Sequence, residues 1–154
     1  MLNNLIQNWI KLLIVLKNTL NKESMMKIGI PKGLLYYKYS SFINTFFHEI
    51  GVETVESRDT NKKILNDGIK YCVSEACLPL KIFHGHVGDI KDKCDAVFVP
   101  RIMKDSNDKF ICPKFCALPE IIKSSIPDIP QIISPAIYMN KKNNFCSEMY
   151  KYLK

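Results

Sequence analysis

Four short apolar segments, separated by stretches in which apolar residues recur at helical spacing, constrain the fold of this chain more than any other feature. They lie near residues 27–31, 52–57, 96–100 and 130–134. Strands that alternate with helices indicate a parallel sheet with right-handed crossover connections. We therefore expect an α/β fold with a Rossmann-like parallel sheet of about four strands and flanking helices.

Turn and capping residues give the expected helix ends. Ser40 or Ser41 is expected to cap a helix that stops at Gly51, because Ser is a favoured N-cap and Gly a favoured terminator. A second helix is expected to start at Thr60, and a third is expected to have Pro79 in its first turn. Two further helices are expected over 118–124 and over about 141–153. Cys112 and Pro113 are expected in a loop.

The loops after two of the strands are expected to border any ligand site. In open parallel sheets, ligands collect beyond the carboxyl ends of the strands. The Pro31–Gly33 loop and the Pro100–Arg101 loop both follow predicted strands. This edge of the sheet is therefore where binding residues are expected.

The first 25 residues form a separate expected unit. Their leucines and Trp9 recur at helical spacing, but Lys11 interrupts the run, which is short for a membrane span. No small-residue cleavage site follows, which argues against a signal peptide. We expect a helical extension over 1–25, without stable membrane insertion, and an α/β lobe over 26–154. An equal alternative is that translation starts at Met25 or Met26.

The net charge of +7 does not by itself indicate a nucleic-acid partner. The basic residues are almost all lysines, scattered along the chain, and the arginines are Arg58 and Arg101. There is no arginine-rich run and no zinc-finger spacing. We therefore expect no nucleic-acid binding, while a site for an anionic phosphate or CoA tail stays open.

Six cysteines raise the question of disulfides or metal chemistry. Because the chain is large and rich in apolar strands, a reducing cytosol is expected rather than a disulfide scaffold. Cys77 and Cys112 each stand beside a proline turn, and both could face a shared pocket. They are the candidate thiolate ligands, with Cys116 a third candidate near Cys112. The remaining cysteines are expected to be structural: Cys72, Cys94 and Cys146.

Other polar residues near the cysteines have two interpretations. Glu75 is expected either to cap the following helix or hydrogen-bond near the site, or to be a solvated surface acid. His84 and His86 lie two apart in a predicted helix and therefore point in different directions. Hydrogen bonding is expected for them rather than metal chelation.

Four segments together resemble a known family: Lys27-Ile28-Gly29-Ile30-Pro31-Lys32-Gly33-Leu34-Leu35-Tyr36-Tyr37; Ser74-Glu75-Ala76-Cys77-Leu78-Pro79-Leu80-Lys81 with His84-Gly85-His86-Val87; Val97-Phe98-Val99-Pro100-Arg101; and Cys112-Pro113-Lys114-Phe115. This set, over roughly residues 26–135, resembles the DUF2229 family. Its members are relatives of 2-hydroxyacyl-CoA dehydratase subunits. They are often fused to, or partnered by, the ATP-dependent CoA-substrate-specific enzyme activase.

The resemblance implies a function as well as a fold. It implies a [4Fe–4S] cluster held by cysteines, in an anaerobic organism, and electron delivery from the activase. Cys77 and Cys112 match the family's cysteine positions, whereas Cys116 falls where the family pattern has none. The neighbouring residues of the expected site are Glu75, His86, Arg101 and Lys114.

The resemblance also implies that this chain supplies only part of a site. Family members are longer, so a C-terminal lobe or a second subunit is expected to add ligands. The expected function is an iron–sulfur component in electron transfer or in radical dehydration of a CoA ester. Whether it is itself an enzyme, as a dehydratase-like lyase component, or an activase-associated protein is left open. The alternative is a truncated, non-catalytic α/β module that binds an activase or partner subunit without a cluster.

Overall fold

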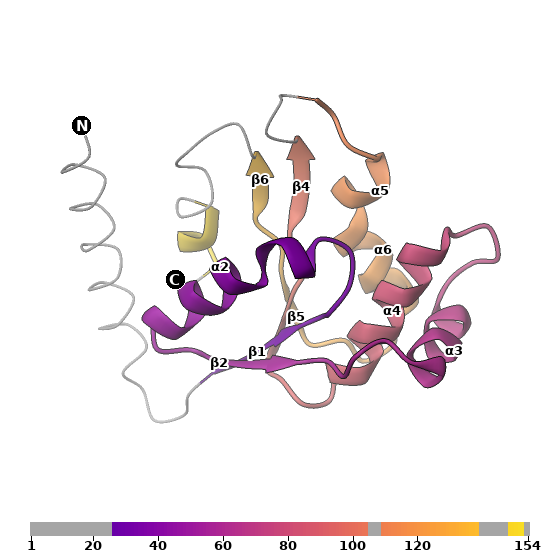
Figure 1. Cartoon of the computed structure of the whole chain (residues 1–154), viewed down its shortest axis with the longest axis horizontal. Helices are drawn as coiled ribbons and strands as arrows, with labels where there is room; N and C mark the ends of the chain where they lie inside the picture. The colour runs from indigo at the N-terminus through magenta and orange to yellow at the C-terminus, as the bar shows by residue number, and fades with distance from the viewer. Residues whose placement is uncertain (1–25, 105–108, 139–147, 153–154) are drawn as a thin grey trace.

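The computed structural model describes residues 26–104, 109–138 and 148–152, and its centre is a parallel four-stranded sheet (Figure 1). The strands are β1 (Lys27–Ile30), β2 (Glu53–Glu56), β3 (Ala96–Phe98) and β5 (Gln131–Ile133), in the order β2-β1-β3-β5. Gly29 pairs with Val55 on one side and with Val97 on the other. The expected α/β sheet is confirmed, with β1 in its interior.

Alternate side chains of the strands enter two apolar layers. Ile28, Ile30 and Phe98 pack against α2 (Tyr36–Glu49), whereas Val97 and Val99 pack with α4 (Leu78–Ile90) and α6 (Leu118–Ser125). This alternation follows from the two-residue period of a strand. The sheet is therefore covered on both faces, as a parallel sheet requires.

The expected helices that lie within the described residues are present, but two of their starts differ from the prediction. Helix α2 begins at Tyr36 rather than after Ser40 or Ser41, and Leu35 is its N-cap. Helix α3 (Lys62–Tyr71) is capped by Asn61, whose side chain accepts hydrogen bonds from the amides of residues 63 and 64. The Thr60 hydroxyl instead contacts a buried histidine. The predicted stop at Gly51 is confirmed, since this residue has a φ of 75°.

A second, two-stranded parallel sheet was not expected from the sequence. It pairs β4 (Arg101–Lys104) with β6 (Ala136–Tyr138), and each strand follows a strand of the main sheet after a two-residue step. Pro100 and Pro135 occupy these steps. Because proline normally ends a strand, the sequence predicts no strand beyond these prolines. The chain instead bends at each proline, and the two segments that follow pair with each other.

The last expected elements are partly visible. The Cys112–Pro113 segment is not simply loop, because Pro113 starts the short helix α5 (Pro113–Cys116), with Cys112 as its N-cap. Residues 148–150 are helical within the expected C-terminal helix. The predictions for residues 1–25, for Cys146 and for the start of that last helix lie outside the described residues. Within the described part of the chain, no helix has both the length and the apolar character needed to cross a membrane.

Candidate functional site

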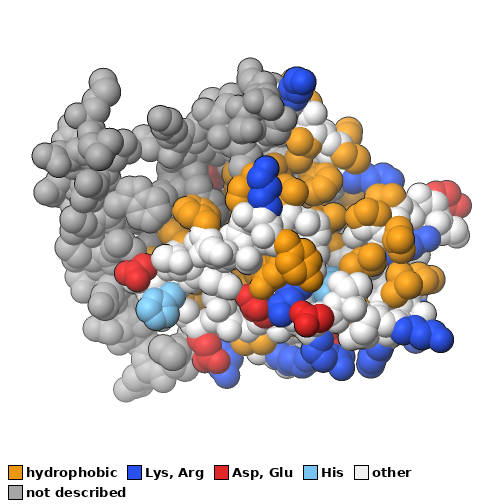
Figure 2. Space-filling view, in the orientation of Figure 1, with side chains coloured by type: hydrophobic (Ala, Val, Ile, Leu, Met, Phe, Trp, Pro, Cys, Tyr) orange, Lys and Arg blue, Asp and Glu red, His pale blue; other side chains and the backbone are white. Residues whose placement is uncertain are grey.

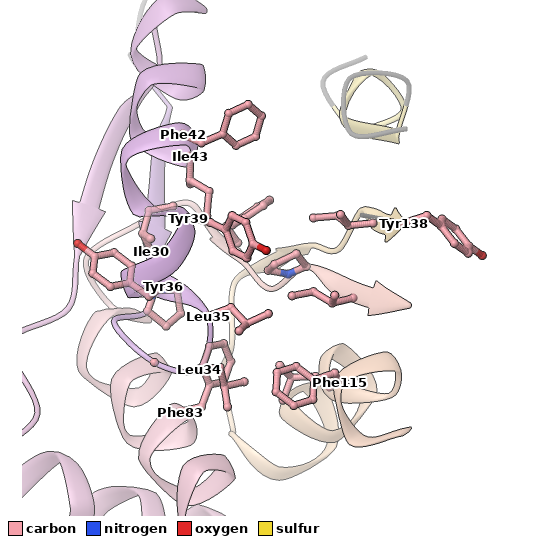
Figure 3. A pocket seen from close by; sticks show the side chains of 17 residues that line it. Ile30, Leu34, Leu35, Tyr36, Tyr39, Phe42, Ile43, Phe83, Phe115 and Tyr138 are labelled. Carbon is pink, nitrogen blue, oxygen red and sulfur yellow. The ribbon is translucent and has the colours of Figure 1, made fainter. Parts of the chain in front are cut away.

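An apolar cavity of about 450 Å³ lies beyond the carboxyl ends of β1 and β3 (Figure 3). The chain goes from β1 to β2 on one side and places β3 on the other, so this is the switch point of the sheet. The cavity is bounded by α2, α4, α5, α6 and the second sheet. Its lining consists of Ile30, Pro31, Gly33, Leu34, Leu35, Tyr36, Tyr39, Phe42, Ile43, Phe83, Phe98, Pro100, Ile102, Phe115, Leu118, Ile137 and Tyr138. The expectation that the loops after these strands border a ligand site agrees with this position.

A buried polar network fixes the loop between β1 and α2 at the edge of the cavity. The backbone amide of Lys32 donates to the Ser57 hydroxyl at 2.9 Å, and that hydroxyl lies 2.8 Å from Nδ1 of His86. The Nε2 of His86 lies 2.9 Å from the Thr60 hydroxyl. Burial lowers the pKa of His86, although the nearby Asp89 opposes the shift. Neutral His86 thus ties α4 to the loops that follow β1 and β2.

Glu56, at the end of β2, is the centre of a second polar cluster beside the cavity. Its Oε1 accepts hydrogen bonds from the Tyr36 hydroxyl and the Asn44 side chain, each at 2.7 Å, and Lys32 Nζ lies 3.4 Å from Oε2. Burial alone would raise the pKa of Glu56, but these donors hold it below its usual value. Burial and the bond to Glu56 raise the pKa of Tyr36. The Tyr36 hydroxyl is therefore directed to Glu56.

Cys77 is the exposed N-cap residue of α4, and its thiol is free. Pro79 lies in the first turn of this helix, as predicted. The preceding turn is held by Lys81, whose Nζ donates to the Ser74 carbonyl at 2.8 Å. Apolar side chains are exposed on both sides of the thiol, with Val73 70% and Leu78 57% accessible. Figure 2 shows hydrophobic side chains gathered on this side of the molecule, over α3 and α4.

Cys112 stands in the corresponding position on α5. It is the exposed N-cap residue, Pro113 follows it, and its thiol is also free. Phe110 beside it is 81% accessible, with Lys104 Nζ 4.7 Å from the ring centroid. The N-terminal ends of α4 and α5 both face the upper right of the view in Figure 1.

Cys116 and Arg101 hold α5 in place. Unlike Cys77 and Cys112, Cys116 is not an exposed cysteine. Cys116 is half-buried, and its Sγ lies 3.4 Å from Sδ of Met103. Arg101 Nη1 donates to the Cys116 carbonyl at 3.0 Å and to Glu120 Oε2 at 2.7 Å. The hydrogen bonds from Arg101 lower the pKa of Glu120. Arg101 therefore joins β4 to α5 and α6, while Lys114 is exposed on α5.

The other described cysteines are structural, as expected. Cys94 is half-buried and its thiol lies 3.2 Å from the Ile90 carbonyl, which accepts from it. Cys72 caps the end of α3 and packs against the core, and burial raises the pKa of both thiols. Within the described ranges, no three His, Cys, Asp or Glu side chains converge as a metal site would require.

The remaining candidates have clear positions. His86 makes the hydrogen bonds described above. His84 is fully buried, with Nδ1 2.8 Å from the Leu80 carbonyl. The prediction of hydrogen bonding for both histidines is confirmed. Glu75 is exposed, and no side chain caps α4 at Cys77, which agrees with the surface-acid alternative.

Sequence reasoning missed the aromatic wall of the cavity. Tyr39 and Phe42 lie on α2, and Phe115 lies on α5. In the sequence such residues are indistinguishable from core positions. The only available signal was the unusual density of aromatic residues between 36 and 47.

The fold and the cavity define an α/β domain of the kind that binds ligands at the carboxyl edge of a parallel sheet. Over residues 27–154 the chain matches the family of the CoA enzyme activase uncharacterised domain (DUF2229), and it belongs to this family. The domain is therefore related to CoA enzyme activases. No curated protein and no solved structure matches the chain.

Proposed function

We propose that this domain is the cysteine-bearing part of an iron–sulfur component that works with a CoA enzyme activase. The observation that carries the proposal is the equivalence of Cys77 and Cys112. Each is a free, exposed thiol at the N-cap of a helix that has a proline in its first turn. Structural cysteines of this chain are instead half-buried, as Cys94 is. A reducing compartment would keep these thiols available.

In this proposal the chain supplies part of the ligand set of a [4Fe–4S] cluster. Thiolates are the usual ligands of such clusters, and about four are needed. The described residues offer two exposed thiols, and no three potential metal ligands among them converge. We therefore assign Cys77 and Cys112 to the cluster and the other ligands to a partner subunit or further lobe. Cys116, which is half-buried, is a further and less favoured candidate ligand within this chain.

The residues around the thiols would hold them in fixed positions. Arg101 binds the Cys116 carbonyl and so fixes α5 behind Cys112, and Lys81 fixes the turn before Cys77. Lys114 would add positive charge beside the thiolates, and Glu75 lies close to Cys77 in the sequence. His86 lies further along α4, where it is bonded to Ser57 and Thr60 instead. When bound, a cluster would accept one electron from the ATP-hydrolysing activase. Dehydration of a 2-hydroxyacyl-CoA ester would be the reaction served by the complete system.

The test is anaerobic reconstitution of the chain with iron and sulfide. Purified protein should turn faintly brown and show a broad visible absorbance shoulder, at a substoichiometric iron content. Cys77→Ser and Cys112→Ser should each remove most of this absorbance, whereas the control Cys94→Ser should retain it. Absorbance that survives in both of the first two variants would reject the assignment.

A second candidate function is a partner-binding module without a cluster. The observation that favours it is the exposure of Val73, Leu78 and Phe110 beside the two cysteines. Apolar side chains exposed together commonly mark a protein interface. Under this alternative, the chain would stay colourless after reconstitution. Leu78→Ser and Phe110→Ser would weaken binding to the activase, while Cys77→Ser and Cys112→Ser would leave this binding unchanged.

A further inference from the structure

The apolar cavity has a lining that excludes charged ligands. None of its seventeen lining residues is acidic, basic, an amide, or a serine or threonine. A carboxylate or phosphate placed inside would lose its hydration and gain no ionic partner, which is strongly unfavourable. A volume of about 450 Å³ is within the range of small-molecule pockets. The interior therefore suits a neutral, apolar group.

The loop at the base of the cavity is held in a strained shape. Leu34 has a φ of 54°, a conformation that is uncommon for residues other than glycine. Its neighbour Gly33 has no room for a Cβ, because Phe83 Cδ2 would lie 2.9 Å from it. Lys32 is fixed through Ser57. Strain that the surroundings enforce is typical of ligand sites, and here it shapes the wall of the cavity.

Among the described lining residues, three tyrosines carry a side-chain hydroxyl. The Tyr36 hydroxyl is bonded to Glu56, and Figure 3 shows the Tyr138 hydroxyl turned away from the other lining side chains. The Tyr39 hydroxyl points among them (Figure 3). In the described part of the chain it has no hydrogen-bond partner. A phenol can donate to a carbonyl oxygen or accept from a hydroxyl group.

We infer that the cavity binds a small neutral ligand, an aromatic or short aliphatic group that carries one uncharged oxygen, and that Tyr39 hydrogen-bonds this oxygen. Neither the cysteines nor a cluster takes part in this binding. It gives the domain a ligand-binding activity at the switch point of its sheet, distinct from the thiols at the ends of α4 and α5.

Binding can be measured with the whole chain and the neutral fluorescent probe N-phenyl-1-naphthylamine. The probe should bind saturably, at one site per chain. Acetophenone should displace it, ethylbenzene should displace it less well, and benzoate should be weaker than acetophenone by about a hundredfold or more, because its charge cannot be buried. Equal competition by benzoate, or no saturable probe binding, would overturn the inference.

Variants locate the site and test the hydroxyl. Leu35→Trp should fill the cavity and weaken probe binding by about tenfold or more; if this variant does not fold, Ile137→Phe replaces it. Tyr39→Phe should keep probe binding but reduce acetophenone affinity about three- to tenfold, the effect of one neutral hydrogen bond. The control Tyr37→Phe, at a residue outside the lining, should change neither. Probe binding unaffected by either filling variant, or acetophenone binding unaffected by Tyr39→Phe, contradicts the assignment.

Discussion

Gly68 of α3 and Gly85 of α4 bring the backbones of the two helices into direct contact. A Cβ on Gly68 would lie 1.8 Å from the Lys81 carbonyl oxygen, and one on Gly85 would lie 1.9 Å from the Ile64 carbonyl oxygen. Both neighbours are backbone atoms, which cannot move aside as a flexible side chain can. The glycine pair therefore fixes how α3 covers α4, the helix that carries Cys77 at its start.

Gly85→Ala should destabilise the domain despite the better helix propensity of alanine. The added methyl group would force the helices apart, and overpacking of this kind costs about 1–3 kcal/mol or more. The measurement is the free energy of unfolding in urea. Gly88→Ala is the matched control, because its Cβ would meet the side chain of Tyr71 at 2.7 Å rather than backbone. It should cost less, and an equal loss in both variants would contradict the backbone-contact explanation.

The main sheet could be predicted from the sequence, whereas the helix contacts and the second sheet could not. Apolar segments ended by Pro31 and Pro100 identified strands because local composition carries that signal. The bend at Pro100 into β4 depends on pairing with β6, about 35 positions away. Likewise, in the sequence Gly68 and Gly85 are recognisable only as residues of low helix propensity. Their fit becomes evident only when α3 and α4 are placed together.

Stability should fall as the pH falls below about 6.5, the ordinary pKa of histidine. Burial lowers the pKa of His84 and of His86 in the folded state, while hydrogen-bonding or acidic neighbours oppose the shift. Because the two histidines have lower pKa values in the folded than in the unfolded chain, their contribution to the free energy of unfolding is fully present above pH 6.5. It is lost as the pH falls through the folded values, with a limiting slope of about 1.4 kcal/mol per pH unit for each histidine.

His86→Gln tests this pH dependence through one residue. The variant should reduce the slope of unfolding free energy against pH, since one of the two buried titrating groups is gone. The unsubstituted chain, measured in the same buffers, supplies the control. An unchanged slope in His86→Gln would show that this histidine does not titrate with unfolding.

Cys77 and Cys112 should react first with a thiol reagent in the native protein. Both are exposed, while Cys94 is half-buried and bonded to the Ile90 carbonyl. Time-resolved labelling with mass spectrometry can assign each site. Cys77 and Cys112 should be modified at least about tenfold faster than Cys94, because access limits the reaction. Comparable rates at all three would contradict the placement of the two loops.

The candidate cysteines were recognisable in the sequence from their neighbouring prolines, but the cavity was not. Cys77-Leu78-Pro79 and Cys112-Pro113 are local patterns, and the structure places both as helix N-caps. The cavity is assembled from α2, α4, α5 and both sheets, so residues such as Tyr39 and Ile137 meet only after folding. Whether the two thiols converge on one cluster stays a prediction.

The central claim is that Cys77 and Cys112 contribute to one cluster that this chain cannot complete alone. The most direct measurement is iron and sulfide content alongside light scattering, in the same anaerobic sample. Iron should be substoichiometric in the monomer and should rise only where two chains, or the chain and a partner, associate. Cys77→Ser, Cys112→Ser and the double variant should lose it equally. A monomer that holds a full complement of tightly bound iron, or single variants that each retain it, would contradict the account.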